Sequence, residues 1–145
     1  MLIEEVMSTE LVTCDVSASV RDAADLMLRN RVGSVVVTNE GSPAGLTSEA
    51  DVLHAGYVTD DPFSAIPVRK AMRRLPTINS RKTLRAATER MRTQRVKKLV
   101  VVEGMTPVGI ITAGNVVDNY AGIRQEVRDI AADADHWSNE GTDDE

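Results

Sequence analysis

The chain contains one sequence unit written twice, and this duplication restricts the fold more than any other feature. Shifting the sequence by 64 positions aligns residues 13–52 with residues 77–116 without a gap, and eleven of the 40 pairs are identical. The phrases "PAGLTSEADVL" and "PVGIITAGNVV", which begin at Pro43 and Pro107, show the likeness most clearly. Two copies are too few for a solenoid, so we expect two matching modules that share a core.

Each copy predicts the order strand, helix, strand, strand, helix. Ser19 and Thr83 stand where N-caps belong, ahead of apolar residues at helical spacing. Short β-branched runs follow, bounded by turns rich in Gly and Pro, and a second helix begins at Ser48 or Thr112. The expected strands are 11–15, 34–38 and 44–47 in the first copy, and 76–79, 98–102 and 108–111 in the second.

Composition indicates a protein that folds without a disulfide or a structural metal and lies in the cytoplasm. A chain of 145 residues can bury enough surface to be stable, and Cys14, the single cysteine, excludes an internal disulfide framework. We see no signal peptide and no apolar run near 18 residues. Charge is uneven: residues 68–98 carry a net +11 and residues 126–145 a net −7. The basic segment suits an anionic ligand or nucleic acid, and the acidic one is solvating or self-masking.

The two copies resemble a tandem pair of cystathionine β-synthase (CBS) domains, also called a Bateman module. The resemblance is carried by "VMSTELVTCDVSASVRDAADLMLRNRVGSVVVTNEGSPAGLTSEADVL" and "VRKAMRRLPTINSRKTLRAATERMRTQRVKKLVVVEGMTPVGIITAGNVV". It implies an α/β fold (α+β by some schemes) of two pseudo-twofold βαββα repeats. Apolar residues at helical spacing past Asp118 add a C-terminal helix, and the composition beyond His136 adds an acidic tail. The expected boundaries are 6–55 for repeat 1, 56–67 for a linker, 68–118 for repeat 2, 119–135 for a helical extension and 136–145 for a disordered tail.

Ser48 and Asp51 support two interpretations. As a structural pair, a hydroxyl at the N-cap with an acid at N3 satisfies free amides and suits the helix dipole. As a binding pair, the helix N-terminus attracts phosphate, the carboxylate accepts from a ribose diol, and Gly45 admits a ligand close to the backbone. The family resemblance favours the second interpretation, because Ser/Thr and Asp at these positions contact phosphate and ribose in CBS domains.

The second copy has Thr112 and Asn115 at the corresponding positions. A neutral amide offers one acceptor oxygen and cannot hold a diol as a carboxylate does. We therefore predict two unequal sites, with Asp51 in the better one and Thr112 touching phosphate in a weaker or empty one.

The resemblance implies further contacts. The short first strands of CBS domains line an adenine pocket, which makes candidates of Thr13, Cys14, Asp15, Thr77, Ile78 and Asn79. CBS domains often have a basic residue just before the second strand of a repeat, where it contacts phosphate. Arg95, Lys97 and Lys98 hold this place in repeat 2, whereas repeat 1 has Arg31, Gly33 and Ser34.

We expect no enzyme and no metal site. His54 and His136 have no ligand spacing, Cys14 has no obvious His partner, and neither a nucleophile elbow nor a phosphate-binding glycine loop occurs. The expected function is regulatory: the module binds AMP, ADP, ATP or S-adenosylmethionine between the repeats, forms homodimers, and signals to an effector protein. No cofactor is required, and no membrane is involved.

The alternative is a ligand-free dimerisation or interaction module that binds nucleic acid through residues 68–98. In that case Ser48 and Asp51 only cap a helix. Against nucleic acid stands the absence of aromatic side chains from the basic segment, which leaves no platform for stacked bases.

Overall fold

A computed structural model describes residues 1–119, and it has the predicted repeat architecture. The expected helical extension past residue 119 and the acidic tail lie outside the described residues. Repeat 1 consists of β1 (Thr13–Asp15), α1 (Val20–Asn30), β2 (Ser34–Asn39), β3 (Ser42–Ser48) and α2 (Glu49–Thr59). Repeat 2 consists of β4 (Thr77–Asn79), α3 (Leu84–Gln94), β5 (Lys98–Glu103), β6 (Thr106–Thr112) and a helix that begins at 113. Short 3-10 helices are η1 (Ile3–Glu5), η2 (Phe63–Ala65) and η3 (Val68–Lys70).

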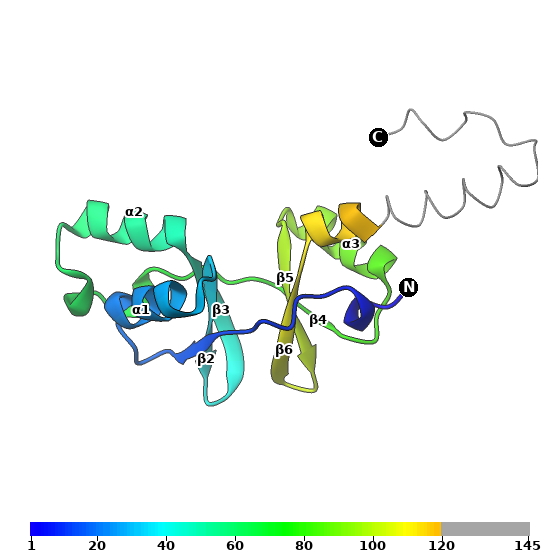
Figure 1. Ribbon diagram of the computed structural model, residues 1–145, viewed down its shortest axis with the longest axis horizontal. Coiled ribbons are helices and arrows are strands. Elements are labelled where there is room, and N and C mark those ends of the chain that lie inside the picture. The colour runs from blue at the N-terminus through cyan, green and yellow to red at the C-terminus, as the bar shows by residue number, and fades with distance from the viewer. Residues whose placement is uncertain (120–145) are drawn as a thin grey trace, which may run out of the picture.

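Each repeat forms a three-stranded sheet of the same topology. In both, the first strand runs parallel to the middle strand, and the third runs antiparallel to it. The registers also repeat at the spacing of 64, with Val36 opposite Leu46 and Val100 opposite Ile110. The mixed α+β fold predicted for the chain is therefore confirmed (Figure 1).

The apolar middle strands are buried on both faces, which is why their sequences do not alternate. Val35 and Val37 of β2 pack in the clusters beneath the helices of repeat 1. Val36, between them, points the other way, because successive side chains of a strand lie on opposite faces. It packs with Leu46, Val100 and Val102 in a cluster that both repeats share. Because β2 and β5 supply both the repeat cores and this shared cluster, the repeats pack as one module.

Two segments cross between the repeats and complete them reciprocally. Residues 1–8 precede repeat 1 but bind repeat 2, where Ser8 forms a β-bridge with Ile110. The segment between the repeats does the reverse, since Arg73 forms a β-bridge with Leu46 of repeat 1. Figure 1 shows the N-terminal segment, in blue, running from the repeat that contains β4–β6 to the repeat that contains β1–β3. Neither repeat is therefore a continuous stretch of sequence.

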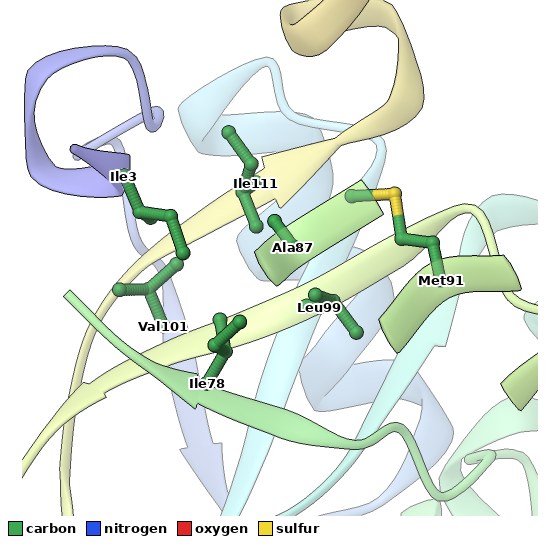
Figure 2. Close-up of a cluster of buried hydrophobic side chains, with 7 residues drawn as sticks. All are labelled: Ile3, Ile78, Ala87, Met91, Leu99, Val101 and Ile111. Carbon is green, nitrogen blue, oxygen red and sulfur yellow. The ribbon is translucent and has the colours of Figure 1, made fainter. Parts of the chain in front are cut away.

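Ile3 shows how strongly the N-terminal segment is integrated. Its side chain is fully buried and packs in one cluster with Ile78, Leu99 and Ile111 of repeat 2 (Figure 2). Burying a residue of this size contributes roughly 1.5–3 kcal/mol to folding. The expected start of repeat 1 at residue 6 therefore leaves out part of the folded module.

The segment expected as a linker, 56–67, is also ordered structure. Helix α2 continues to Thr59 and ends at Asp60, which adopts the left-handed conformation that stops helices. Farther on, Ile66 is buried against α1 and α2, and its carbonyl accepts from the Val20 amide. The polar and proline-rich composition of this stretch hid these contacts, because they involve single apolar residues between turns.

Candidate functional site

Ser48 and Asp51 form a complete capping box at the start of α2. The Asp51 amide donates to Ser48 Oγ at 3.2 Å, while the Ser48 amide and hydroxyl both donate to Asp51 Oδ2 at 2.9 Å. This geometry fits the structural interpretation of the pair. It also means that one oxygen of the carboxylate is occupied by the protein itself.

The other oxygen of Asp51 faces an arginine that sequence reasoning did not single out. Arg73 Nε lies 3.2 Å from Asp51 Oδ1; the Asp51 side chain is 17% exposed and the Arg73 side chain 67%. Sequence patterns gave no signal for Arg73, because it contacts Asp51 only where the segment that joins the repeats packs back against repeat 1. One position in a run of basic residues does not reveal such a contact.

The corresponding corner in repeat 2 has the same backbone and a different charge. The Thr112 amide donates to Asn115 Oδ1, and the Asn115 amide donates to Thr112 Oγ1, both at 3.0 Å. Ser8 occupies the place of Arg73, since its amide and carbonyl pair with Ile110 as those of Arg73 pair with Leu46. The Asp and Arg of the first corner are thus replaced together by two neutral residues.

A cleft of about 360 Å³ lies between the two repeats. Its lining residues come from β3, from the segment that joins the repeats, from the loop between α3 and β5, and from the first residue of β5: Leu46, Arg73, Leu75, Arg95, Val96, Lys97 and Lys98. The structure thus brings Arg95, Lys97 and Lys98 together around one opening, with Arg73 joining the cleft to Asp51. The Lys97 carbonyl also accepts from the Ala113 amide at 2.9 Å, which fixes this loop beside Thr112.

The three candidates on β1 differ in their surroundings. Cys14 packs among the core residues of repeat 1, and burial, with Asp22 and Asp15 as smaller causes, raises the pKa of its thiol to about 11. Asp15 accepts from the Ser17 hydroxyl and amide, and these bonds lower the pKa of its carboxyl. Thr13 is exposed at the start of the strand.

The candidates on β4 divide in a similar way. Ile78 is 2% exposed and belongs to the core of repeat 2, so its side chain cannot line an adenine pocket. Strand alternation points the side chain of residue 78 toward α3, where it packs with Ala87 and Met91. Asn79 is exposed and accepts from the Arg81 amide, and the Thr77 carbonyl accepts from the Arg90 guanidinium.

Gly45 does not leave room for a ligand. A Cβ at this position would lie 2.7 Å from the Arg73 carbonyl oxygen, and one at Gly109 would lie 2.6 Å from that of Ser8. The glycines of the repeated phrase are therefore explained by the crossing segments, which approach β3 and β6 at these points. Our interpretation of Gly45 as an opening for a ligand was wrong.

Two basic residues of α3, Arg90 and Arg92, make contacts within the protein. The Arg90 guanidinium donates to the Thr77 carbonyl, and Arg92 pairs with Glu89 on the same helix. These contacts fit an ordinary solvated helix face better than a surface organised for nucleic acid.

Within residues 1–119, no group of three His, Cys, Asp or Glu side chains is placed to hold a metal ion. None of the helices described is long and apolar enough to span a bilayer.

Comparison with known proteins agrees with this architecture. The family model for the CBS domain matches the chain twice, at residues 3–57 and 65–122. A curated relative, the CBS domain-containing protein YhcV of Bacillus subtilis, is 24% identical over 118 residues, which cover 81% of this chain and 84% of the relative.

Solved structures share the fold. The CBS domain protein PAE2072 from Pyrobaculum aerophilum, complexed with AMP, has a TM-score of 0.70 and 23% identity, covering 79% of this chain and 89% of its own. The CBS domain pair of protein MJ0100, in complex with 5-methylthioadenosine and S-adenosyl-L-methionine, has a TM-score of 0.71 and 18% identity, covering 84% and 97%.

Proposed function

The chain belongs to the CBS domain family, and on that premise we propose that it is a regulatory module that senses an adenosine-containing metabolite. The ligand class comprises AMP, ADP, ATP and S-adenosylmethionine. It binds in the cleft between the repeats, and an effector protein reads the resulting change. No catalytic role is assigned to any residue.

The observation that carries this proposal is the convergence of two kinds of group on one cleft. Arg73, which pairs with the carboxylate of Asp51, lines the cleft on its repeat 1 side, and Arg95, Lys97 and Lys98 line it on its repeat 2 side. A carboxylate can accept from the hydroxyls of a ribose, while guanidinium and ammonium groups bind phosphate. The AMP bound to PAE2072 and the adenosine compounds bound to MJ0100 support the same ligand class.

The residues proposed to bind keep their separate roles. Ser48 and Asp51 form the main ribose and phosphate corner, and Thr112 and Asn115 the weaker one. Of the proposed adenine contacts, Thr13, Cys14, Asp15, Thr77 and Asn79 remain, with backbone groups reading the base edge. Ile78 contributes only its backbone, because its side chain is buried in the core.

Signalling requires that the ligand bind two arrangements of the repeats with different affinity, because equal affinity shifts no equilibrium. The crossing segments provide the connection. Arg73 belongs to the segment that joins the repeats, and its backbone amide and carbonyl both bond to Leu46 at 2.9 Å. A ligand that contacts Asp51 and Arg95 bridges the repeats directly, so it biases their relative packing.

The output surface is a homodimer interface on the helices of repeat 1. Leu28 on α1 and Leu53 and Tyr57 on α2 are 79%, 71% and 86% exposed. Leu53 and Tyr57 are four residues apart and so share one helix face. Large apolar side chains exposed on the surface of these helices suit association with another protein. Light scattering of the protein and of Tyr57→Arg tests this part, and a monomer in both cases would contradict it.

Calorimetric titration with AMP, ADP, ATP and S-adenosylmethionine at low ionic strength tests the proposed function. We expect saturable one-site binding by at least one of them, and a rise in melting temperature with ligand concentration. Binding of none of the four would contradict the proposal. A gel shift with DNA and RNA over a salt series tests the nucleic-acid alternative, which requires affinity that falls steeply with salt.

A further inference from the structure

We propose that the cleft selects adenosine ligands that carry a polyphosphate chain, and that Arg73 is the specificity-determining residue. This inference rests on the proposed function and narrows its ligand class. It excludes S-adenosylmethionine as a strong ligand and ranks ATP above ADP, and ADP above AMP.

The positive charge of the cleft favours a ligand with several phosphates. Four of its seven lining residues are cationic, and the other three are apolar (Leu46, Leu75 and Val96). The nearby carboxylate of Asp51 is already paired with one of these cations, Arg73. A chain of phosphates complements such a lining, because each phosphate can accept charge-assisted hydrogen bonds from Arg and Lys. A sulfonium cation meets like charge there and is repelled.

The contacts of Asp51 place Arg73 in competition with the ribose of a ligand. Its Oδ2 already accepts hydrogen bonds from the amide and hydroxyl of Ser48, so a ribose hydroxyl must donate to Oδ1. Arg73 Nε lies 3.2 Å from this same Oδ1. Ligand and arginine therefore compete for the same oxygen. An ion pair whose arginine is 67% exposed is weak and exchanges readily. A ribose that takes Oδ1 frees the guanidinium, which already lines the cleft, to bind the phosphates.

The exchange makes Arg73 act in opposite directions on two ligands. For adenosine, which has no phosphate, Arg73 is only a competitor for Asp51. For ATP, contacts between Arg73 and the phosphate chain replace the ion pair that Arg73 loses at Asp51. Arg73 thus penalises adenosine ligands without phosphate and favours those with several. The second corner lacks this device, because Ser8 stands in the place of Arg73 and Asn115 in that of Asp51.

The test is calorimetric titration of the full chain and of Arg73→Gln with adenosine, AMP, ATP and S-adenosylmethionine. The substitution keeps the backbone bonds between residue 73 and Leu46, so the crossing segment stays in place. We expect Arg73→Gln to bind ATP about tenfold more weakly. The same variant should bind adenosine about two- to fivefold more tightly, because the competing ion pair is gone. Damage to the fold alone would weaken both ligands together.

Arg95→Gly and Arg31→Gly form a matched pair of controls. Both arginines end a helix in the left-handed conformation, with φ of 58° and 55°, where glycine fits without strain. Only Arg95 lines the cleft. Arg95→Gly should reduce the preference for ATP over AMP about tenfold, and Arg31→Gly should leave it unchanged.

The outcomes separate this inference from the function on which it rests. Equal affinity of the native chain for adenosine, AMP and ATP would overturn polyphosphate selection and leave the adenosine sensor intact. S-adenosylmethionine binding as tightly as ATP would do the same. A parallel loss of adenosine and ATP binding in Arg73→Gln would overturn the role of Arg73. Failure of every adenosine compound to bind the native chain would overturn the proposed function itself.

Discussion

The carbonyl oxygen of Arg73 lies against Gly45, 2.7 Å from the position that a Cβ of residue 45 would occupy. Gly109 and Ser8 repeat this contact in the other half, at 2.6 Å. In both places the atom in the way belongs to a backbone, which cannot turn aside as a side chain can. The close approach of the crossing segments thus requires glycine at both positions.

Gly45→Ala is accordingly expected to destabilise the protein by about 1–3 kcal/mol, as other overpacking substitutions do. The added methyl group must push the crossing segment away from β3, which strains the bonds between Arg73 and Leu46. Denaturant unfolding measures the loss. Gly41→Ala serves as a comparison of a different kind, because nothing lies within 4 Å of its Cβ position and only its φ of 84° opposes the change. A Gly45→Ala variant as stable as the native chain would contradict the role given to the crossing segment.

Ile3→Ala is expected to cost about 2–5 kcal/mol, because it removes a fully buried side chain from the core of repeat 2. The loss should appear in repeat 2 although the residue precedes repeat 1. Hydrogen exchange checks this: amides of β5 and β6 should lose protection before those of β2 and β3. Val58→Ala, at a side chain that is 62% exposed, is the matched control and should change stability by less than about 0.5 kcal/mol.

The fold could be predicted from the sequence to a large extent because the repeat is local and regular. Capping residues such as Ser19 and Thr83 and the apolar strand runs carry their own signals, and the helices and strands follow them. The crossing segments could not be predicted. Their key residues, Ile3 and Arg73, contact elements far along the chain, and no spacing between neighbouring residues encodes such a contact.

The candidate site could be predicted in part, for the same reason. Ser48, Asp51 and the basic group at 95–98 lie in local motifs. The structure pairs Asp51 with Arg73, and Arg73 lines one cleft together with Arg95, Lys97 and Lys98. The burial of Ile78 and the true neighbour of Gly45 depend on packing between elements, where the sequence alone misled us.

Cys14 gives a prediction for alkaline pH. Burial raises the pKa of its thiol from 9.0 to about 11, so the folded state favours the neutral thiol more than the unfolded state does. The resulting stability is fully present below pH 9 and is lost as the pH rises toward 11. The free energy of unfolding of the native chain should fall over this range by more than that of Cys14→Ser. Equal slopes for the two proteins would contradict the assignment.

The same burial should protect Cys14 from reagents, because the thiolate is the reactive form. At pH 8 the folded chain should react with iodoacetamide at least about tenfold more slowly than the unfolded chain, since its thiolate fraction is smaller. Mass spectrometry of timed samples follows the reaction. Labelling at the rate of the unfolded chain would show that the thiol is not held in the core.

The central claim is that the Asp51 corner of the cleft, and not its Asn115 counterpart, binds an adenosine ligand. Asp51→Asn tests it sharply, because it copies the capping pair already present at Thr112 and Asn115 and removes only the carboxylate charge. Calorimetric titration with ATP should show about tenfold weaker binding for Asp51→Asn and a change of less than about twofold for Asn115→Ala. Equal losses in the two variants, or no ATP binding by the native chain, would contradict the claim.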